Sequence, residues 1–422
     1  MEVKEKKVLV FGSGISGIGA AKLLAQHGAQ VVLYDGNEKL DKAGLLSSLG
    51  GGPKTSVVLG SFPEELLDGL DMVILSPGVP TDLPVVVEMR KRGIQVIGEV
   101  ELAYAFGKGD VLAITGTNGK TTTTSLLGEI MKNYQDNVYI VGNIGNPYTA
   151  VAGQMNENTI TVAEMSSFQL ESIVDFRPKV SAILNFTPDH LNRHHTMEAY
   201  VNAKKNIARN QGPQDYCILN YEDSLTREFG KKVKAQVLYF SSQRKLEKGI
   251  YLEDGNIIYR NGEEVSVCRV DELQLLGTHN YENVMAAVAM AYVYGVPMET
   301  IRKSIKEFRG VEHRIEYVTE KNGVAYYNDS KGTNPDAAIQ ALRAMPGPTI
   351  LIAGGYDKNG TYDAWVEEFA GKVKYLVLIG QTRDKTADCA KEHGFTEIMY
   401  AEDMQEAVQV CAVYADIGDC VL

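Results

Sequence analysis

Two glycine-rich segments of the sequence have the spacing of phosphate-binding turns. The first, GSGISG at residues 12–17, lies between an apolar segment and a helical pattern, and Asp35 closes the next apolar segment. Glycines at this spacing let the backbone approach a diphosphate, a helix N-terminus attracts it, and the carboxylate can accept ribose hydroxyls. By itself this segment predicts a dinucleotide site, and the alternative is a tight turn without a ligand.

The second segment, GTNGKTT, predicts a site for a nucleoside triphosphate. Its backbone amides could cradle phosphates, the ammonium group of Lys120 could reach the terminal phosphates, and the hydroxyl of Thr121 could bind Mg²⁺. The turn is shorter than a general P-loop, because Ile114 stands where that motif has its first glycine. The candidate ATP residues here are Gly116, Thr117, Asn118, Gly119, Lys120, Thr121 and Thr122.

The presence of both turns separates three classes of enzyme. An NAD-dependent dehydrogenase would use the first turn and leave the second without a role. A P-loop kinase would use the second turn and leave the first without a role. An enzyme that uses ATP on a second, diphosphate-bearing substrate accounts for both.

Polar residues further along the chain could complete a metal site. Glu164 follows an apolar segment, where a carboxylate can hold Mg²⁺ against phosphates, and the alternative is a helix cap or a surface charge. His190 and His194 have the i,i+4 spacing of a zinc pair, but no HExxH glutamate accompanies them. We therefore expect His190 to be catalytic or to lie near magnesium, with solvated neighbours.

Other polar residues are less specific by themselves. Lys204 lies near the middle of a helical pattern and is expected, on this basis alone, to be an exposed lysine. Asn280 and Asn283 could simply begin a helix. The segments around Arg314 and Asp329 place charged and small polar groups in connections, where binding groups concentrate.

Alternating strand and helix patterns must position these residues. Strands that alternate with helices favour parallel sheets with right-handed crossovers. The predicted strands are 8–11, 31–34, 72–75, 95–97, 111–115, 159–163, 180–185, 349–353 and 375–379, with a β-rich stretch at 237–270. The predicted helices include residues 15–27, a helix that begins near Lys120, and residues 280–294.

These patterns predict an α/β protein of three domains. A chain of 422 residues is too long for one ordinary core, and typical domain sizes suggest roughly two to four domains. We expect a Rossmann-like domain over 1–98, a P-loop-type central ATPase domain over 99–310 and a Rossmann-like domain over 311–422. Residues 417–422 have the pattern of a turn that enters an apolar strand with no covering helix after it. We therefore expect the chain to end short of a complete C-terminal binding site.

Composition narrows the function further. The formal net charge of −12 disfavours nucleic acid as a partner, because a phosphate backbone requires a concentrated basic surface. The sequence has neither a cleavable apolar leader nor a run of about 18 apolar residues, so we expect a cytoplasmic protein without a membrane partner. The five cysteines are scattered without a CxxC pair, which predicts neither disulfides nor a thiolate metal site.

The motifs, taken in order, resemble those of the Mur ligase family over essentially the whole chain. They are GTNGKTT, GNIG, EMSSFQLE, NFTPDHLNRH, residues 202–204, GTHNYEN, EHR and NDSKGTNPDA. The resemblance implies an ATP-dependent ligase of peptidoglycan precursor synthesis that adds D-glutamate to UDP-N-acetylmuramoyl-L-alanine through an acyl phosphate. It implies successive domains for the UDP-sugar, ATP and the amino acid, and we expect a monomer. Another Mur or folylpolyglutamate-type ligase that uses a different amino acid is the nearest alternative. A non-catalytic UDP-sugar binding module is disfavoured because Lys120, Thr121 and Glu164 are all present.

The resemblance also implies roles for individual residues. Because the family uses the first glycine turn for UDP and not for NAD, the residues expected to bind the UDP-sugar are Gly14, Ile15, Ser16, Asp35, Ser76, Gly78 and Asn143. Those expected to bind ATP beside the GTNGKTT segment are Asn280, Arg314 and Asp329, and those expected to bind D-glutamate are Lys331, Thr333 and Lys358. The ligands implied for two Mg²⁺ ions are Thr121, Glu164, His190 and a carbamylated Lys204. The implied catalytic residues are Lys120, Glu164, His190 and Lys204.

Overall fold

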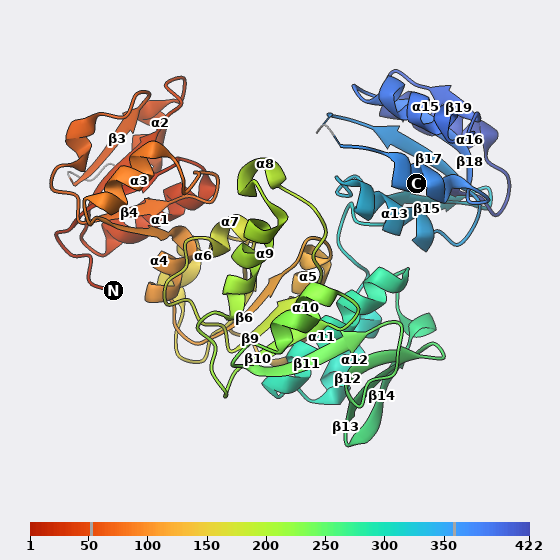
Figure 1. Cartoon of the computed structure of the whole chain (residues 1–422), viewed down its shortest axis with the longest axis horizontal. Helices are drawn as coiled ribbons and strands as arrows, with labels where there is room; N and C mark the ends of the chain where they lie inside the picture. Colours follow the sequence, from red (N-terminus) through yellow and green to blue (C-terminus); the bar gives the residue numbers. More distant parts are fainter. Residues whose placement is uncertain (51–53, 358–359) are drawn as a thin grey trace. The chain divides into compact units, whose positions relative to one another are not determined.

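The computed structural model describes residues 1–50, 54–357 and 360–422 of the chain. These residues form three sheets with helices packed against them, shown from red to blue along the chain in Figure 1. The chain divides into two compact units, which are described separately. Unit 1 comprises Met1–Cys268 and Asn283–Ile305, and unit 2 comprises Arg269–Glu282 and Lys306–Leu422. The predicted α/β fold class is confirmed.

The first sheet is parallel throughout and has the strand order β3-β2-β1-β4-β5. Its strands are β1 (Lys7–Phe11), β2 (Gln30–Asp35), β3 (Thr55–Leu59), β4 (Met72–Leu75) and β5 (Gln95–Gly98). Its helical elements are α1 (Ile15–Gln26), α2 (Lys42–Ser48), η1 (Glu64–Leu67), α3 (Pro84–Lys91) and α4 (Glu99–Phe106). The strand order reverses between β1 and β4, and ligands of such sheets bind at the carboxyl ends of the strands beside this point. The turns after β1 and β4 therefore both lie where a ligand is expected.

The second sheet has the order β14-β13-β12-β11-β10-β9-β6-β8-β7. Its strands are β6 (Asp110–Thr115), β7 (Val138–Gly142), β8 (Ile160–Glu164), β9 (Val180–Ile183), β10 (Tyr216–Asn220), β11 (Gln236–Ser241), β12 (Lys248–Glu253), β13 (Asn256–Asn261) and β14 (Glu263–Arg269). Its helices are α5 (Lys120–Tyr134), α6 (Tyr148–Val151), α7 (Ser167–Leu170), α8 (Leu191–His194), α9 (Met197–Lys205), α10 (Ser224–Gly230), α11 (Thr278–Tyr294) and α12 (Met298–Glu307), with 3₁₀ turns η2 (Ala152–Gln154), η3 (Asn206–Ala208) and η4 (Val270–Glu272). The strands from β7 to β12 pair in parallel, and β13 pairs with β12 in an antiparallel hairpin.

Strand β6 is the central element for the second glycine turn. Its neighbours on either side are β8 and β9, and its sequence DVLAIT is buried along nearly its whole length. A continuous apolar run is typical of a parallel strand that is covered on both faces. Because parallel strands end at one edge of the sheet, the segments that follow β6, β8 and β9 meet there. They carry the second glycine turn, Glu164 and Asn185, respectively.

The first two sheets share a hydrophobic core within unit 1. One continuous cluster of buried residues includes Val8 of the first sheet and Ala113 and Ile183 of the second. Helix α6 packs against both α1 and α4. Gly19 allows the approach of α1, because a Cβ atom at this position would lie 2.6 Å from the hydroxyl oxygen of Thr149. This packing places the loop after β4 close to the segment around α7.

The third sheet, in unit 2, has the order β15-β16-β20-β17-β18-β19 and is parallel except for the β15-β16 hairpin. Its strands are β15 (Glu316–Lys321), β16 (Val324–Asn328), β17 (Thr349–Gly354), β18 (Val373–Ile379), β19 (Ile398–Tyr400) and β20 (Cys420–Val421). Its helical elements are α13 (Pro335–Ala344), α14 (Asp363–Val366), η5 (Glu367–Phe369), α15 (Arg383–Glu392) and α16 (Met404–Tyr414). The predicted strand within residues 417–422 is confirmed as β20, which lies between β16 and β17.

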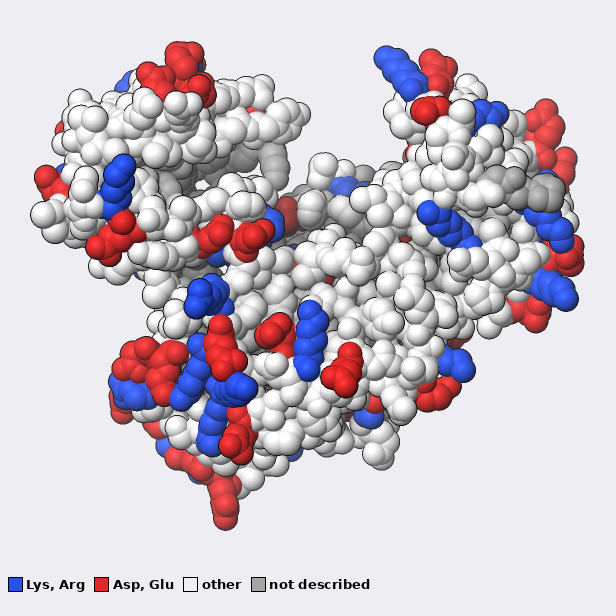
Figure 2. All heavy atoms as spheres, turned by 180° about the vertical axis from the view of Figure 1, so that it is seen from behind, with Lys and Arg blue, Asp and Glu red and all other residues white. Residues whose placement is uncertain are grey.

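Charged side chains of both signs lie on one face of the molecule. On the face shown in Figure 2, blue lysine and arginine side chains lie among red aspartate and glutamate side chains. Among the described residues, no helix is both long enough and apolar enough to span a lipid bilayer.

Candidate active site

The second glycine turn requires glycine at two positions. A Cβ atom at Gly116 would lie 2.9 Å from the Cβ of Leu184, and one at Gly119 would lie 2.1 Å from Oδ1 of Asn283. Gly119 also has a φ of 85°, in the left-handed region that side chains disfavour. Helix α5 begins directly after it at Lys120, as predicted, so the positive end of the helix dipole lies at the turn.

Asparagine and threonine side chains hold this turn in place. Oδ1 of Asn185 accepts hydrogen bonds from the backbone N–H groups of Thr117 (3.1 Å) and Asn118 (2.8 Å). The hydroxyl of Thr117 donates to the carbonyl of Thr187 (3.0 Å) and lies 2.9 Å from the hydroxyl of Tyr200. Asn185 and Tyr200 had no predicted role. The position of Asn185 just after a buried apolar segment is the signal that could have identified it.

Two lysines converge on one carbonyl oxygen of the turn. Nζ of Lys120 donates to the carbonyls of Gly116 (3.0 Å) and Thr117 (2.7 Å). Nζ of Lys204, from α9, donates to the same Gly116 carbonyl at 2.7 Å. The structure therefore brings together a predicted phosphate-binding lysine and a lysine that is distant in the sequence.

Lys204 is buried, and the expectation that it would be exposed is wrong. Only 2% of its surface is accessible, because the face of α9 that carries Lys204 packs against the turn and does not face solvent. Burial, followed by the positive charge of Lys120, holds the pKa of Lys204 well below its usual range, and the carboxylates of Asp189 and Glu164 oppose this shift. A lysine in this environment is an unusually good source of a neutral, nucleophilic amine.

Glu164 presents a buried carboxylate at the end of β8. It is 1% exposed, and its Oε1 accepts a hydrogen bond from Nδ2 of Asn143 at 2.8 Å. Its Oε2 is buried and has no hydrogen-bond partner within the described part of the chain. A buried, unpartnered carboxylate oxygen is costly unless a cation binds it. Glu164 therefore fits a divalent metal ion, and Thr121 offers a hydroxyl on the first turn of α5.

His190 lies in a strained segment near this edge of the sheet. Its backbone has φ 52° and ψ 29°, a left-handed conformation that is uncommon for a residue other than glycine and that concentrates at functional sites. Its ring is about half exposed, lies 3.6 Å from Asp189 through Nε2, and contacts the ring of Phe168. The strain and exposure suit a residue that contacts a ligand or a hydrated ion.

We expected the histidines near His190 to be solvated, and for His194 this prediction is wrong. The His194 ring is buried, with Nε2 2.9 Å from the hydroxyl of Ser167 and Nδ1 3.1 Å from Glu171. It also stacks on Phe168, and burial lowers its pKa. Because both ring nitrogens bond to side chains around α7, His194 orders that segment and does not pair with His190 as a metal ligand.

The first glycine turn is built for close backbone contact. Gly12 has a φ of 101°, and a Cβ atom at Gly17 would lie 1.9 Å from the Gly12 carbonyl oxygen. The hydroxyl of Ser76, just after β4, donates to the same carbonyl at 3.1 Å. Ile15 is 78% exposed, although it is a large apolar residue. The predicted UDP-sugar residues Gly14, Ile15, Ser16, Ser76 and Gly78 thus surround one edge of the first sheet.

The carboxylate of Asp35 accepts hydrogen bonds from the first glycine turn. Its Oδ2 accepts hydrogen bonds from the backbone N–H (2.9 Å) and the hydroxyl (2.7 Å) of Ser13, and its Oδ1 accepts from the N–H of Asn37 at 2.9 Å. Burial raises the pKa of Asp35, but these hydrogen bonds outweigh burial and hold it below its ordinary value. The residue is therefore an anion at neutral pH, able to accept further hydrogen bonds from hydroxyl or amide donors.

Unit 2 groups several of its predicted ligand residues. Asp329 accepts a hydrogen bond from the N–H of Ile315 at 3.0 Å, and burial raises its pKa to about 6 against the opposing charge of Arg314. Asn280 is buried and donates through Nδ2 to a backbone carbonyl at 2.8 Å. His279, for which no role was predicted, belongs to the same group, because burial and the charge of Arg314 lower its pKa to about 4.

The residues predicted to bind D-glutamate lie on or near a polar connection. Lys331 and Thr333 are exposed in the segment between β16 and α13, and the backbone N–H of Lys331 donates to the carbonyl of His313 at 3.1 Å. Lys358 lies outside the described residues.

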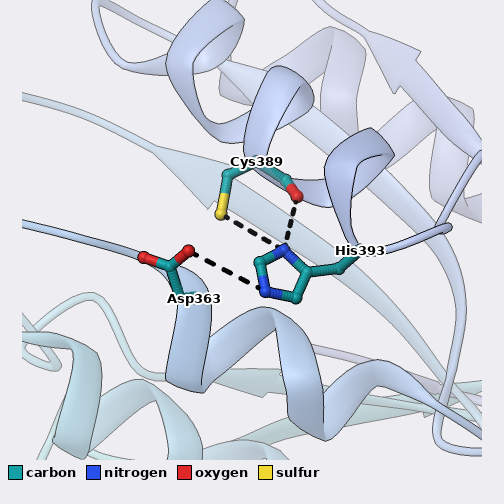
Figure 3. A group of neighbouring side chains, drawn as sticks. All are labelled: Asp363, Cys389 and His393. Atoms are coloured by element: carbon teal, nitrogen blue, oxygen red, sulfur yellow. Dashed lines mark hydrogen bonds and ion pairs between the residues drawn. The ribbon is translucent and has the colours of Figure 1, made fainter.

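A separate cluster in unit 2 contains residue types that can bind metals. Ligand atoms of Asp363, Cys389 and His393 lie within 4.8 Å of one another (Figure 3). Nδ1 of His393 lies 2.9 Å from the carbonyl oxygen of Cys389 and 3.9 Å from its sulfur, while Nε2 lies 3.8 Å from Asp363. Nδ1 is therefore within hydrogen-bond distance of a carbonyl, whereas Nε2 is too far from Asp363 for a hydrogen bond. Because Mg²⁺ prefers oxygen ligands, this sulfur-containing group does not suit the ion expected at the second glycine turn.

Comparison with protein families matches three successive segments of the chain. Residues 6–98 match the MurD-like N-terminal domain of Mur ligases, residues 114–291 match the Mur ligase middle domain, and residues 313–422 match the Mur ligase glutamate ligase domain.

Similar proteins match over nearly the full length. The chain is 58% identical to a UDP-N-acetylmuramoylalanine--D-glutamate ligase of Lachnoclostridium phytofermentans, over 99% of this chain and 92% of the relative. It is 45% identical to the ligase of the same name from Clostridioides difficile, over 100% of this chain and 94% of the relative. Among solved structures, the MurF ligase of Thermotoga maritima in complex with ADP has a similar fold, with a TM-score of 0.60 at 18% identity, over 100% of this chain and 91% of that one.

Proposed function

This chain belongs to the Mur ligase family, and we propose that it joins D-glutamate to the alanyl carboxylate of UDP-N-acetylmuramoyl-L-alanine, with ATP as the phosphoryl donor. The observation that carries the proposal is the group around the second glycine turn. There two lysines contact the Gly116 carbonyl, and a buried carboxylate oxygen of Glu164 has no partner in the described structure. This arrangement suits phosphoryl transfer between two anions.

The reaction needs activation of the substrate carboxylate. A carboxylate is a poor acyl donor because its leaving group would be oxide. Attack of a carboxylate oxygen on the γ-phosphorus of ATP forms an acyl phosphate and releases ADP. The amine of D-glutamate then attacks the acyl carbon, the amide bond forms, phosphate leaves, and the amine loses its proton. Lys120 is held at the mouth of the turn, where its positive charge stabilises the charge on the transferred phosphoryl group.

Magnesium fits the residues present at this turn. We assign Thr121 and the unpartnered oxygen of Glu164 to one ion, with His190 and Lys204 assigned to a second. When bound, the ions supply charge neutralisation for the phosphate oxygens. Asn143 orients the Glu164 carboxylate through its hydrogen bond to Oε1, so Oε2 would be the oxygen that holds an ion.

Lys204 is proposed to act as a carbamate. Its lowered pKa favours the neutral amine, whose lone pair can attack the carbon of CO₂ as a C–O π bond opens and the nitrogen loses a proton. The carbamate places a negative charge beside Lys120, where a second ammonium group would be repelled. The resulting carbamate supplies the oxygen ligands that magnesium prefers, whereas an ammonium group would repel the ion.

The remaining substrate groups are assigned to the other two domains. We propose that residues 1–98 bind the UDP-sugar, that residues 99–310 bind ATP, and that residues 311–422 bind the amino acid. Asp35 then accepts hydrogen bonds from neutral groups of the uridine, and the exposed N-terminus of α1 faces the diphosphate. In unit 2, Arg314, Asp329 and Asn280 are proposed to contact ATP. The residues proposed for D-glutamate are Lys331, Thr333 and Lys358.

An assay of phosphate release tests the assignment. The protein should release phosphate from ATP only when both UDP-N-acetylmuramoyl-L-alanine and D-glutamate are present. The same assay with L-glutamate, L-lysine and meso-diaminopimelate tests whether another amino acid is the true substrate. A change in nicotinamide absorbance with no phosphate release would instead identify a dehydrogenase that uses the first glycine turn.

A further inference from the structure

A small pocket lies within unit 1, where the first sheet meets the segment around α7. Ser76 and Thr81 line it from the loop after β4, Glu99 lines it from the start of α4, and Phe168 and Gln169 line it from α7. It lies at the carboxyl ends of β4 and β5, the edge at which ligands of parallel sheets bind. No role in the reaction has so far been given to Glu99.

Glu99 places an unpartnered oxygen in this pocket. The residue is 3% exposed, and its Oε1 accepts a hydrogen bond from Nε2 of Gln169 at 3.1 Å. Its Oε2 is also buried, and no hydrogen bond to it exists within the described residues. Burial raises the pKa of Glu99 to about 6, although the bond from Gln169 opposes this shift. A buried carboxylate that keeps one oxygen unsatisfied is destabilising, so a structural role alone does not explain it.

Glu101, on the same helix, shows what a purely structural buried glutamate looks like in this protein. It is 2% exposed and accepts three backbone hydrogen bonds, from the N–H groups of Val174 (2.8 Å), Asp175 (2.7 Å) and Phe176 (3.1 Å). Both of its oxygens are satisfied by the protein. The contrast indicates that the second oxygen of Glu99 is reserved for a group that the protein does not supply.

The composition of the pocket limits what that group can be. Its lining residues within the described structure include no lysine, arginine or histidine. Arg193 lies beside the pocket, where it donates to the carbonyl of Val79, but its guanidinium is already paired with Glu171 at 3.0 Å. A phosphate or carboxylate group would therefore meet the Glu99 carboxylate without an unpaired lining cation to offset the repulsion. Among the described lining residues Glu99 is the one acidic group, so the pocket lacks a second carboxylate to hold a metal ion. A neutral hydrogen-bond donor, such as a hydroxyl or an amide N–H, is the partner that suits Oε2.

The pocket also lies between two parts of the proposed substrate site. On one side, Ser76 donates to the carbonyl of Gly12 in the first glycine turn. On the other side, Gln169 accepts hydrogen bonds from the backbone N–H (2.9 Å) and the hydroxyl (3.0 Å) of Ser166. Ser166 follows Glu164 by two residues in the sequence. If UDP lies at the first turn and the alanyl carboxylate lies near Glu164, the sugar that links them must pass this pocket.

We propose that Glu99 forms a subsite for the sugar of the substrate, in which Oε2 accepts a hydrogen bond from a hydroxyl or the acetamido N–H. The inference rests on the proposed function, because it takes the positions of UDP and the carboxylate from it. Glu99 is a binding residue in this scheme, and Gln169 positions its carboxylate. The subsite discriminates between the complete UDP-sugar and UDP alone, because only the former carries the donor.

Calorimetric titration of Glu99→Gln with two ligands tests the subsite. The substitution keeps the shape and the bond from Gln169 but replaces the accepting Oε2 with a donor. The affinity for UDP-N-acetylmuramoyl-L-alanine should fall about 10-fold or more, as expected for a lost hydrogen bond to a charged group, while the affinity for UDP stays unchanged. Glu101→Gln is the matched control, which should lower the melting temperature and leave the ratio of the two affinities as in the wild type.

The outcomes separate this subsite from the proposed function. Equal affinities of wild type and Glu99→Gln for the complete substrate would overturn the subsite and indicate a bound water at Oε2. Parallel losses for UDP and for the UDP-sugar would also overturn it, because they would indicate a general distortion. If the wild type bound no UDP-sugar, the proposed function itself would fail. If Glu99→Gln does not fold, Glu99→Asp is the second variant, because its shorter side chain moves the carboxylate oxygens out of the pocket and keeps the charge. The same selective loss of affinity for the UDP-sugar is expected.

Discussion

The turn after β1 and the turn after β6 have the same backbone plan and different side chains around it. Each follows a buried parallel strand, begins a helix, and contains a glycine at which a Cβ atom would collide with a neighbour. The collision distance is 1.9 Å at Gly17 and 2.1 Å at Gly119. At the first turn the carboxylate of Asp35 accepts hydrogen bonds from Ser13. At the second turn, Lys120 and Lys204 both donate to the Gly116 carbonyl.

This difference shows that glycine spacing defines a place for phosphate groups but not the chemistry done there. A turn closed by a carboxylate can bind a nucleotide through backbone amides and neutral hydroxyls, and it offers no positive charge to a reacting phosphoryl group. A turn that carries the ammonium group of Lys120 and a buried acidic side chain suited to a metal ion can stabilise charge that develops during transfer. We therefore expect substitutions at the second turn to affect turnover and substitutions at the first to affect binding.

The largest effect is expected for Lys120→Ala. Removal of the ammonium group should lower turnover by about 10³-fold or more, because its charge stabilises the phosphoryl group in transfer. Phosphate release under saturating substrates measures this loss. Calorimetric binding of the UDP-sugar is the control and should change little, since the first turn is intact. Turnover equal to that of the wild type would contradict the assigned role.

Glu164→Gln should have the next largest effect. The amide lacks the charge that binds magnesium, so turnover should fall about 10²-fold and stabilisation of the fold by Mg²⁺ should disappear. Without Mg²⁺ the variant should be at least as stable as the wild type, because an unpartnered buried carboxylate oxygen is destabilising. Melting temperatures with and without Mg²⁺ test both points. A variant that magnesium stabilised as much as the wild type would exclude Glu164 as a ligand.

Lys204→Ala tests the proposed carbamate. Turnover should fall roughly 10-fold to 100-fold, as for other losses of a metal-supporting group, and added short carboxylates such as acetate should restore part of it. Lys205→Ala is the matched control from the next position of α9, and we expect it to retain turnover. Intact mass under mild conditions should reveal CO₂ on the wild type and not on Lys204→Ala. Full activity of Lys204→Ala without added carboxylate would exclude the carbamate.

Asp35→Asn should have the smallest effect, on binding and stability and not on chemistry. Loss of the charged acceptor for Ser13 should cost about 1 kcal/mol of unfolding free energy at neutral pH and weaken UDP binding several-fold. The folded pKa of Asp35 lies below the ordinary value of 3.8, so its contribution is present above pH 3.8 and is lost as the pH falls through the folded pKa.

Chemical denaturation over a range of pH checks the sign of the Asp35 effect. The difference in unfolding free energy between the wild type and Asp35→Asn should be constant near neutrality and narrow under acidic conditions. A gap that widened as the pH fell would contradict the lowered pKa. Turnover at saturating substrate should stay near that of the wild type, and a large loss there would remove the distinction between the two turns.

Local sequence was sufficient to predict the elements that hold both turns. The predicted strand 72–75 is β4, and helix α5 begins at Lys120 as expected, because apolar runs and glycines act over a few neighbouring residues. The polar residues at the strand ends were predicted as ligands for the same reason, since a polar residue at the end of a buried strand is visible in the sequence. Glu164 is an example.

Tertiary structure alone decided the environments of the side chains. Lys204 has the local pattern of an exposed helical lysine, yet it is buried against a turn that is far from it in the sequence. Glu99 and Glu101 are both buried glutamates of the same helix. Segments beyond residue 165 supply three backbone N–H groups to Glu101 but a single side-chain amide to Glu99. No periodic pattern encodes this difference, because hydrogen-bond partners and desolvation arise from long-range packing and not from neighbours in the chain.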